Sequence, residues 1–281
     1  MEQIILNIIE NIISFGFNHQ LVFMTLLGGV FPTFVWMLFW MHEGECDEEP
    51  DPETGITYLC EPEPRWLLLA TFLSGGASVL VTLLLENLVH PFFSGTDLII
   101  VWASIEEVLK YSVFWFVDYK SDKLNEPADA LVYLSVVALG FSAIENSLFL
   151  YQALSHGDIT GAVIGQNYRF LGASILHVLS SGFIGICIGY TFFGGLLSRR
   201  FATIFGILGA IALHSTFNYF IIMGSGAAGL KVPAIIWGVG IVFIILIEGL
   251  RFLAKQHKKT RYEEYQNSRY ENKENIFPTH S

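Results

Sequence analysis

The chain has 281 residues, of which 53% are hydrophobic and only 15% are charged, and its formal net charge is −11. Soluble domains carry about 25% charged residues, so this composition predicts a polytopic membrane protein. The acidic balance argues against nucleic-acid binding, which depends on basic patches. We therefore expect an all-α bundle of transmembrane helices whose constant partner is the lipid bilayer.

The first apolar segment, IILNIIENIISF, carries Asn7, Glu10 and Asn11 at helical spacing. This pattern predicts an amphipathic helix that lies on the membrane surface. A transmembrane span needs about 20 predominantly apolar residues, and about seven segments further along the chain meet this requirement. They are residues 21–41, 66–86, 96–117, 129–152, 172–195, 201–222 and 233–253.

These segments divide the chain into four parts. Residues 1–95 hold the interfacial helix and two spans, which are joined by the acidic loop 43–65. Residues 96–222 hold the next four spans and form the core of the bundle. Residues 223–254 hold the last span, and residues 255–281 form a polar tail.

The distribution of Lys and Arg near the span ends predicts the orientation. One side of the membrane collects the N-terminus and loops with few basic residues. The other side collects Arg65, Lys120, Lys123, Arg199, Arg200 and the basic residues of the tail. The second side is expected to be cytoplasmic, so that the N-terminus lies outside and the C-terminus lies in the cytoplasm.

Several predicted spans contain ionisable side chains, which cost about 2.5–3.5 kcal/mol each on insertion scales. Counted from the predicted outer end of its span, each of four such residues lies roughly 7–15 Å deep, at 1.5 Å per residue. This shared depth predicts one site in which the groups face one another. The four are Glu106, Glu145, His177 and His214, and Glu107 and Lys110 accompany the first of them.

The spacing of these residues adds detail. Glu106 precedes Lys110 by four residues, the favourable order for a helical ion pair. Glu107 lies about 100° around the helix, so Lys110 is expected to neutralise one carboxylate and leave the other free to act on water. His214 and Asn218 also lie four apart and present donors on one face, as an oxyanion stabiliser requires. Taken alone, the Glu106–Lys110 pair is explained equally well as a structural ion pair.

Glu and His are residues that activate water, either as a general base or through a bound metal. Together with donors for an oxyanion, they indicate hydrolysis of an acyl bond, with a peptide bond in or beside the bilayer as the expected substrate. The sequence contains neither HExxH nor GxSxG. These absences argue against a zincin and against a serine hydrolase with a nucleophile elbow.

Four segments resemble, in order and spacing, the motifs of the PrsW family of intramembrane proteases. They are EEVLKY (106–111), EPADALVYLSVVALGFSAIENSLF (126–149), RFLGASILHVLSSGFIGICIGY (169–190) and ALHSTFNYF (212–220). The family is related to the glutamic intramembrane proteases of the CAAX-prenyl-protease type, whose motifs are EExxxR, FxxxH and HxxxN. In this sequence the segment that corresponds to FxxxH is FSAIE, so Glu145 stands where the CAAX-prenyl-protease type has His. The resemblance makes residues 96–222 the predicted catalytic core.

The resemblance implies roles for six residues. Glu106 and Glu107 would supply the base, Glu145 and His177 would help to hold the water, and His214 and Asn218 would polarise the scissile carbonyl. It also implies a bacterial or archaeal cell membrane, and a membrane-protein substrate such as a single-pass anti-sigma factor.

Two alternatives remain for the cofactor. In one, Zn²⁺ is bound by Glu106, Glu145, His177 and His214. In the other, no metal takes part and a carboxylate alone activates the water. An ion- or proton-coupled transporter is the alternative function, because intramembrane Glu, Lys and His also mark ion pathways. The sequence lacks the paired Gly/Pro interruptions in corresponding halves that are typical of transporters.

Overall fold

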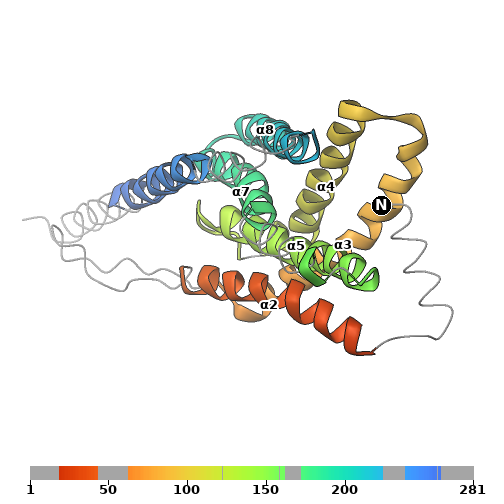
Figure 1. The fold of residues 1–281 in the computed structure, drawn as a ribbon. Helices are drawn as coiled ribbons and strands as arrows, with labels where there is room; N and C mark the ends of the chain where they lie inside the picture. The colour runs from red at the N-terminus through yellow and green to blue at the C-terminus, as the bar shows by residue number, and fades with distance from the viewer. Residues whose placement is uncertain are drawn as a thin grey trace, which may run out of the picture.

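The computed structural model describes residues 19–43, 63–121, 123–157, 159–161, 172–223, 238–257 and 259–260. Across these residues the regular secondary structure is helical, with no β-strand, so the predicted all-α class is confirmed (Figure 1). The predicted interfacial helix, most of the acidic loop and most of the polar tail lie outside the described residues.

Each predicted span overlaps a described helix. The helices are α2 (His19–Glu43), α3 (Arg65–Val89), α4 (Gly95–Val117), α5 (Asp129–Ser155), α7 (Ser174–Tyr190), α8 (Leu196–Met223) and a helical segment at 238–257. A short 3-10 helix, η1 (His90–Phe92), joins α3 to α4. Four described stretches are long and apolar enough to cross a membrane: Leu21–Leu38, Arg65–Phe92, Asp129–Ser155 and Leu196–Phe220. The membrane-bundle architecture is confirmed, and the count of seven spans stays a prediction.

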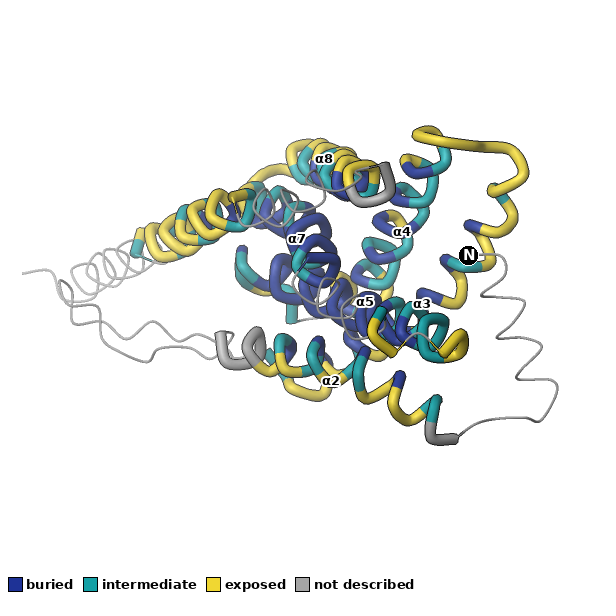
Figure 2. The backbone as a smooth tube through the Cα atoms, in the orientation of Figure 1, coloured by how far each residue is buried: buried dark blue, intermediate teal, exposed yellow. Residues whose placement is uncertain are grey.

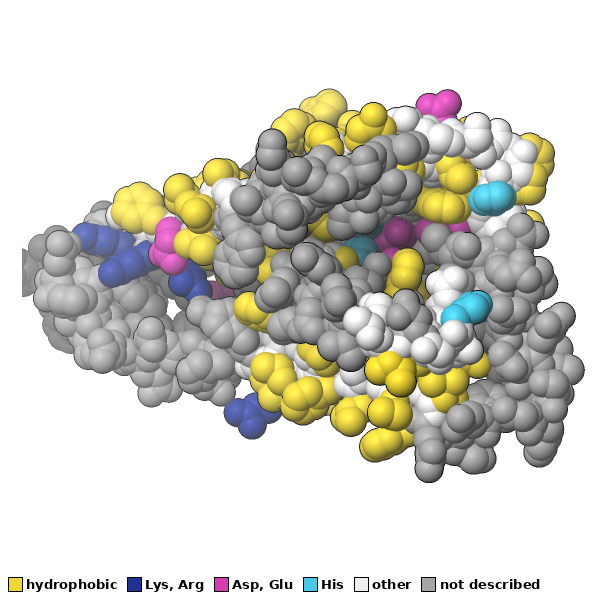
Figure 3. Space-filling view, in the orientation of Figure 1, with side chains coloured by type: hydrophobic (Ala, Val, Ile, Leu, Met, Phe, Trp, Pro, Cys, Tyr) yellow, Lys and Arg dark blue, Asp and Glu magenta, His cyan; other side chains and the backbone are white. Residues whose placement is uncertain are grey.

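Helix α5 lies at the centre of the bundle, in contact with α2, α3, α4 and α7. Every residue from Asp129 to Ala143 is buried, and Figure 2 shows this stretch enclosed by its neighbours. A helix that is apolar on all faces is expected to be buried in this way. The outer helices instead expose large apolar side chains, which cover much of the described surface in Figure 3 and suit contact with lipid.

The backbones of α3 and α5 approach each other closely at two glycines. A Cβ atom on Gly140 would overlap the carbonyl oxygen of Phe72, and one on Gly75 would overlap that of Val137. Helices α5 and α7 meet similarly, since Gly185 faces the backbone of Leu131. Small residues permit such approaches in membrane bundles. These contacts fix the position of α5 along its axis relative to α3 and α7.

At the end of the bundle predicted to be cytoplasmic, acidic groups join α3, α4 and α5. Asp118 is fully buried just after α4, and one of its carboxylate oxygens accepts a hydrogen bond from Thr71 of α3 at 2.5 Å. Burial raises the pKa of Asp118 to about 7. Tyr133 of α5 donates a hydrogen bond to Glu63, which precedes α3. The helices are thus joined by polar contacts at this end as well as by close packing in the middle.

We expect Gly140→Ala to lower the thermal unfolding temperature in detergent micelles. The added methyl group would force α3 and α5 apart, and overpacking of this kind costs typically about 1–3 kcal/mol. Gly240→Ala is the matched control, because a Cβ atom there meets nothing within 4 Å. Equal unfolding temperatures for the two variants would contradict the close contact described here.

Candidate active site

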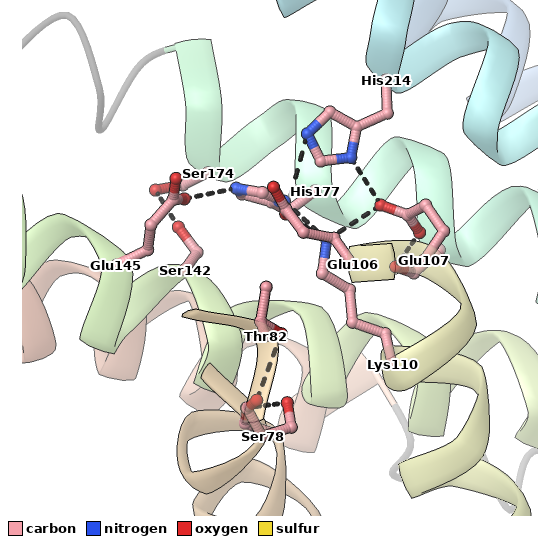
Figure 4. Close-up of polar contacts among 12 residues, drawn as sticks. Ser78, Thr82, Glu106, Glu107, Lys110, Ser142, Glu145, Ser174, His177 and His214 are labelled. Atoms are coloured by element: carbon pink, nitrogen blue, oxygen red, sulfur yellow. Dashed lines mark hydrogen bonds and ion pairs between the residues drawn. The ribbon is translucent and has the colours of Figure 1, made fainter. Parts of the chain in front are cut away.

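The ionisable side chains that share a predicted depth converge at one place in the bundle (Figure 4). Glu107 and Lys110 are completely buried, and Glu106, His177 and His214 are at most 6% exposed. The side chain of Glu145 is 23% exposed. The cluster, hereafter the Glu–His cluster, comprises Glu106, Glu107 and Lys110 of α4, Glu145 of α5, His177 of α7 and His214 of α8.

Lys110 is the cation of the cluster, and its ammonium group contacts three partners. Its Nζ atom lies 2.8 Å from Glu107 Oε1, 3.3 Å from Glu106 Oε2 and 2.8 Å from His177 Nδ1. The expectation that Lys110 neutralises a single carboxylate is therefore wrong. The physical reason is that positions three and four residues apart both face one another on a helix, so a long side chain reaches both.

Glu107 uses both of its carboxylate oxygens in contacts with the protein. Oε1 accepts hydrogen bonds from Lys110 and from His214 Nδ1, the latter at 2.7 Å. Oε2 accepts a hydrogen bond from Ser181 Oγ at 2.9 Å. Since Glu107 is also fully buried, it orients its neighbours and does not face open space. Ser181 lies four residues after His177, and this spacing is the one signal in the sequence that places it near the cluster.

Each histidine has one nitrogen against a carboxylate and the other turned toward Glu106. His214 Nδ1 contacts Glu107, and its Nε2 lies 3.8 Å from Glu106 Oε2. His177 Nε2 lies 2.8 Å from Glu145 Oε2, and its Nδ1 lies 3.8 Å from Glu106 Oε2. Because a carboxylate only accepts, these outer contacts assign the ring protons to His214 Nδ1 and His177 Nε2. The remaining lone pair of His214 faces Glu106, and that of His177 accepts a hydrogen bond from Lys110.

Three of these residues offer a possible metal site. One ligand atom each from Glu106, His177 and His214 lies within 4.8 Å of the others. A carboxylate with two His is a donor set that catalytic zinc uses. Glu107 and Glu145 contact the other ring nitrogens of the two histidines, as carboxylates do beside zinc-bound histidines. Glu145 is not a member of this trio, since it contacts the outer nitrogen of His177. Lys110 competes with a metal for the His177 Nδ1 lone pair.

Asn218 is the predicted site residue that the structure does not join to the cluster. It lies one turn after His214 on α8 and is half-buried. Within the described part of the chain, no hydrogen bond connects its amide to the Glu–His cluster. A polar network near the cluster instead links Asn146 and Ser142 of α5 to Ser174 of α7, at 2.9–3.1 Å.

A cavity adjoins the cluster and reveals an acidic residue that sequence reasoning missed. Glu86 of α3 lines this cavity together with Glu106 and Glu145. In the sequence, Glu86 is the last residue of the predicted span 66–86, where a charged residue is ordinary. Its burial could not be inferred, because it depends on how α3 packs against α4 and α5.

The helices and their polar centre define an integral membrane protein with a buried cluster of Glu, His and Lys side chains. Residues 63–249 match the protein family described as "PrsW family intramembrane metalloprotease". This match covers more than half of the chain, which therefore belongs to the PrsW family, as the four motifs predicted.

Similar proteins include three that are each named Protease PrsW. The one from Oceanobacillus iheyensis is 33% identical over 132 residues, which cover 46% of this chain and 56% of that protein. The one from Clostridioides difficile is 29% identical over 169 residues, which cover 57% of this chain and 69% of that protein. The one from Geobacillus kaustophilus is 27% identical over 166 residues, which cover 58% of this chain and 70% of that protein. The chain thus spans little more than half the length of the first of these relatives. No solved structure matches it.

The contact between Lys110 and Glu107 can be tested by a double-mutant cycle. Lys110→Met should destabilise the protein by about 3–5 kcal/mol, because it leaves a buried carboxylate without its cation. Adding Glu107→Gln should restore part of that loss, since the uncompensated charge is then removed. Unfolding in detergent micelles measures the four free energies, and strictly additive effects would show that the two groups do not interact.

Proposed function

We propose that the protein is an intramembrane peptidase that hydrolyses a peptide bond of a membrane protein, with Glu106 as the general base. The observation that carries this proposal is the contrast between the two neighbouring glutamates. Glu107 is saturated by three donors, whereas Glu106 lines the cavity and its nearest ammonium contact is longer, at 3.3 Å. Membership of the PrsW family and the printed names of the relatives support a peptidase over a transporter.

The contacts suggest how each group takes part. A water molecule in the cavity gives a proton to Glu106 while its oxygen attacks the scissile carbonyl carbon. The proton then passes to the amide nitrogen as the C–N bond breaks, leaving a carboxyl group and an amine. Glu107 positions Lys110 and His214, and Glu145 orients His177, so these two carboxylates act through their neighbours.

The expected role of His214 as a donor to the oxyanion depends on which of its ring nitrogens carry protons. With Nδ1 donating to Glu107, its Nε2 carries a lone pair and cannot donate to a carbonyl oxygen. To stabilise the oxyanion, His214 must carry protons on both nitrogens. The proposed role of Asn218 as a second donor requires its amide to turn toward the substrate.

A divalent metal would supply Lewis-acid polarisation of the water or the carbonyl, and Glu106, His177 and His214 would hold it. Zinc is the ion whose usual donors they match. Glu106 would then be a ligand rather than the base. Lys110 favours the version without a metal, because its Nζ already contacts both Glu106 and His177. The ammonium group there provides the positive charge that a metal would otherwise bring.

The orientation and the substrate belong to the same proposal. With the N-terminus outside, the cluster lies nearer the outer surface, and a single-pass membrane protein such as an anti-sigma factor would be cut on that side. The basic residues of the described chain near the opposite end, Lys120, Lys123, Arg199 and Arg200, support this orientation.

We expect Glu106→Gln to reduce cleavage by about 10²–10⁴-fold, the usual contribution of a general base. Glu107→Gln should reduce it less, because glutamine still accepts a hydrogen bond from Lys110. The measurement compares membrane-protein fragments, by mass spectrometry, from cells that express each variant. Glu248→Gln is the control, since Glu248 forms an exposed pair with Arg251. Unchanged fragment patterns with Glu106→Gln would refute the proposal.

Metal dependence is tested by elemental analysis of the purified protein. We expect less than one equivalent of zinc per chain, and cleavage that survives treatment with a chelator. Lys110→Met should raise zinc binding, because it frees the His177 Nδ1 lone pair and removes a competing cation. One zinc per wild-type chain, with activity lost on chelation, would instead establish the metal-dependent version.

A further inference from the structure

The cavity beside the Glu–His cluster is acidic at several points and apolar elsewhere. Three carboxylates line it, one from each of three helices: Glu86 of α3, Glu106 of α4 and Glu145 of α5. Among the described residues that line it there is no Lys, Arg or His. Its remaining walls are Val79, Thr82, Leu83, Phe141, Leu148 and Phe149.

Glu86 differs from the carboxylates of the Glu–His cluster because no described residue forms a hydrogen bond or an ion pair with it. It is 4% exposed, and none of the described residues donates a hydrogen bond to its carboxylate. Glu107, by comparison, accepts from Lys110, His214 and Ser181. A buried carboxylate without a partner costs several kcal/mol if it is ionised, and otherwise it holds a proton. A cation that enters the cavity would offset this cost.

The cavity has the chemistry for the charged head of a long cationic side chain. Its interior volume is about 30 Å³, which is enough for a group the size of an ammonium, and it opens at its mouth. The side chains of Lys and Arg combine an apolar stem with a charged head. The apolar walls suit the stem, and the Glu86 carboxylate suits the head.

We propose that this cavity is a substrate subsite for a basic side chain, Lys or Arg, next to the scissile bond, and that Glu86 selects it. This inference rests on the proposed peptidase function. Glu106 belongs both to the cavity and to the Glu–His cluster, so the backbone of a bound residue passes the general base. Glu86 therefore determines specificity, while Glu106 remains the group that contacts the reacting water.

The test uses two sets of single-pass peptides in lipid vesicles with the reconstituted protein. One set carries a single Lys, moved residue by residue through the outer half of the membrane segment. The other carries norleucine at the same positions, which has the same four-carbon stem without the ammonium group. Binding is measured by photocrosslinking to the Glu107→Gln protein, in which cleavage is slowed.

At one or two adjacent positions, the Lys peptide should bind at least about 10-fold more tightly than the norleucine peptide, as for a hydrogen bond between charged groups. Adding Glu86→Gln should remove this preference, whereas Glu248→Gln should keep it. Equal binding of the Lys and norleucine peptides at every position would overturn the inference. A Lys preference that survives Glu86→Gln would overturn the assignment to Glu86.

Cleavage of the same peptides separates this inference from the proposed function. Cleavage by the wild-type protein without a Lys preference leaves the peptidase proposal intact and refutes the subsite. A Lys preference in binding with no cleavage of any peptide would support the subsite and refute the peptidase proposal. If Glu86→Gln slows cleavage of Lys and norleucine peptides equally, Glu86 acts in the reaction itself, and its role in selection is refuted.

Discussion

The buried contact between Lys110 and Glu107 is the interaction on which the arrangement of the site depends. Both side chains are fully enclosed, so neither charge is stable without the other. Satisfying the rest of the Glu107 carboxylate requires donors from two further helices, and Ser181 of α7 and His214 of α8 supply them. One pair of charges on α4 therefore determines how α7 and α8 present their polar faces.

Packing in α5 provides the complementary constraint. Gly140 admits the backbone of α3, and Gly185 of α7 admits the backbone of α5, so these three helices have little freedom to slide. Glu145 and His177 lie on two of them and meet at 2.8 Å. The apolar contacts thus hold the helices at the heights at which their polar groups can pair. Electrostatics and packing specify the same arrangement, which is a sign of a well-defined fold.

Much of the cluster could be predicted because the rise of a helix per residue is nearly constant. Counting residues from the span ends was enough to bring Glu106, Glu145, His177 and His214 to one depth. Counting could not give the side-chain contacts. The double contact of Lys110 and the saturation of Glu107 depend on side-chain conformations and on donors from other helices. Glu86 was missed for a related reason, since a residue near a span end is buried or exposed according to its neighbours.

The height of the cavity within the bundle has a consequence for how a substrate helix is opened. Glu86 lies three residues before the end of α3, so under the proposed function a side chain that reaches it comes from near the end of the substrate's own membrane segment. There the terminal backbone groups of a helix already lack intrahelical hydrogen-bond partners. A scissile bond beside Glu106 would lie deeper, at roughly 7–15 Å, but still in the outer half of the bilayer. Fraying of the substrate helix from its end would then supply part of the unwinding that a cut at the bilayer centre would leave to the peptidase.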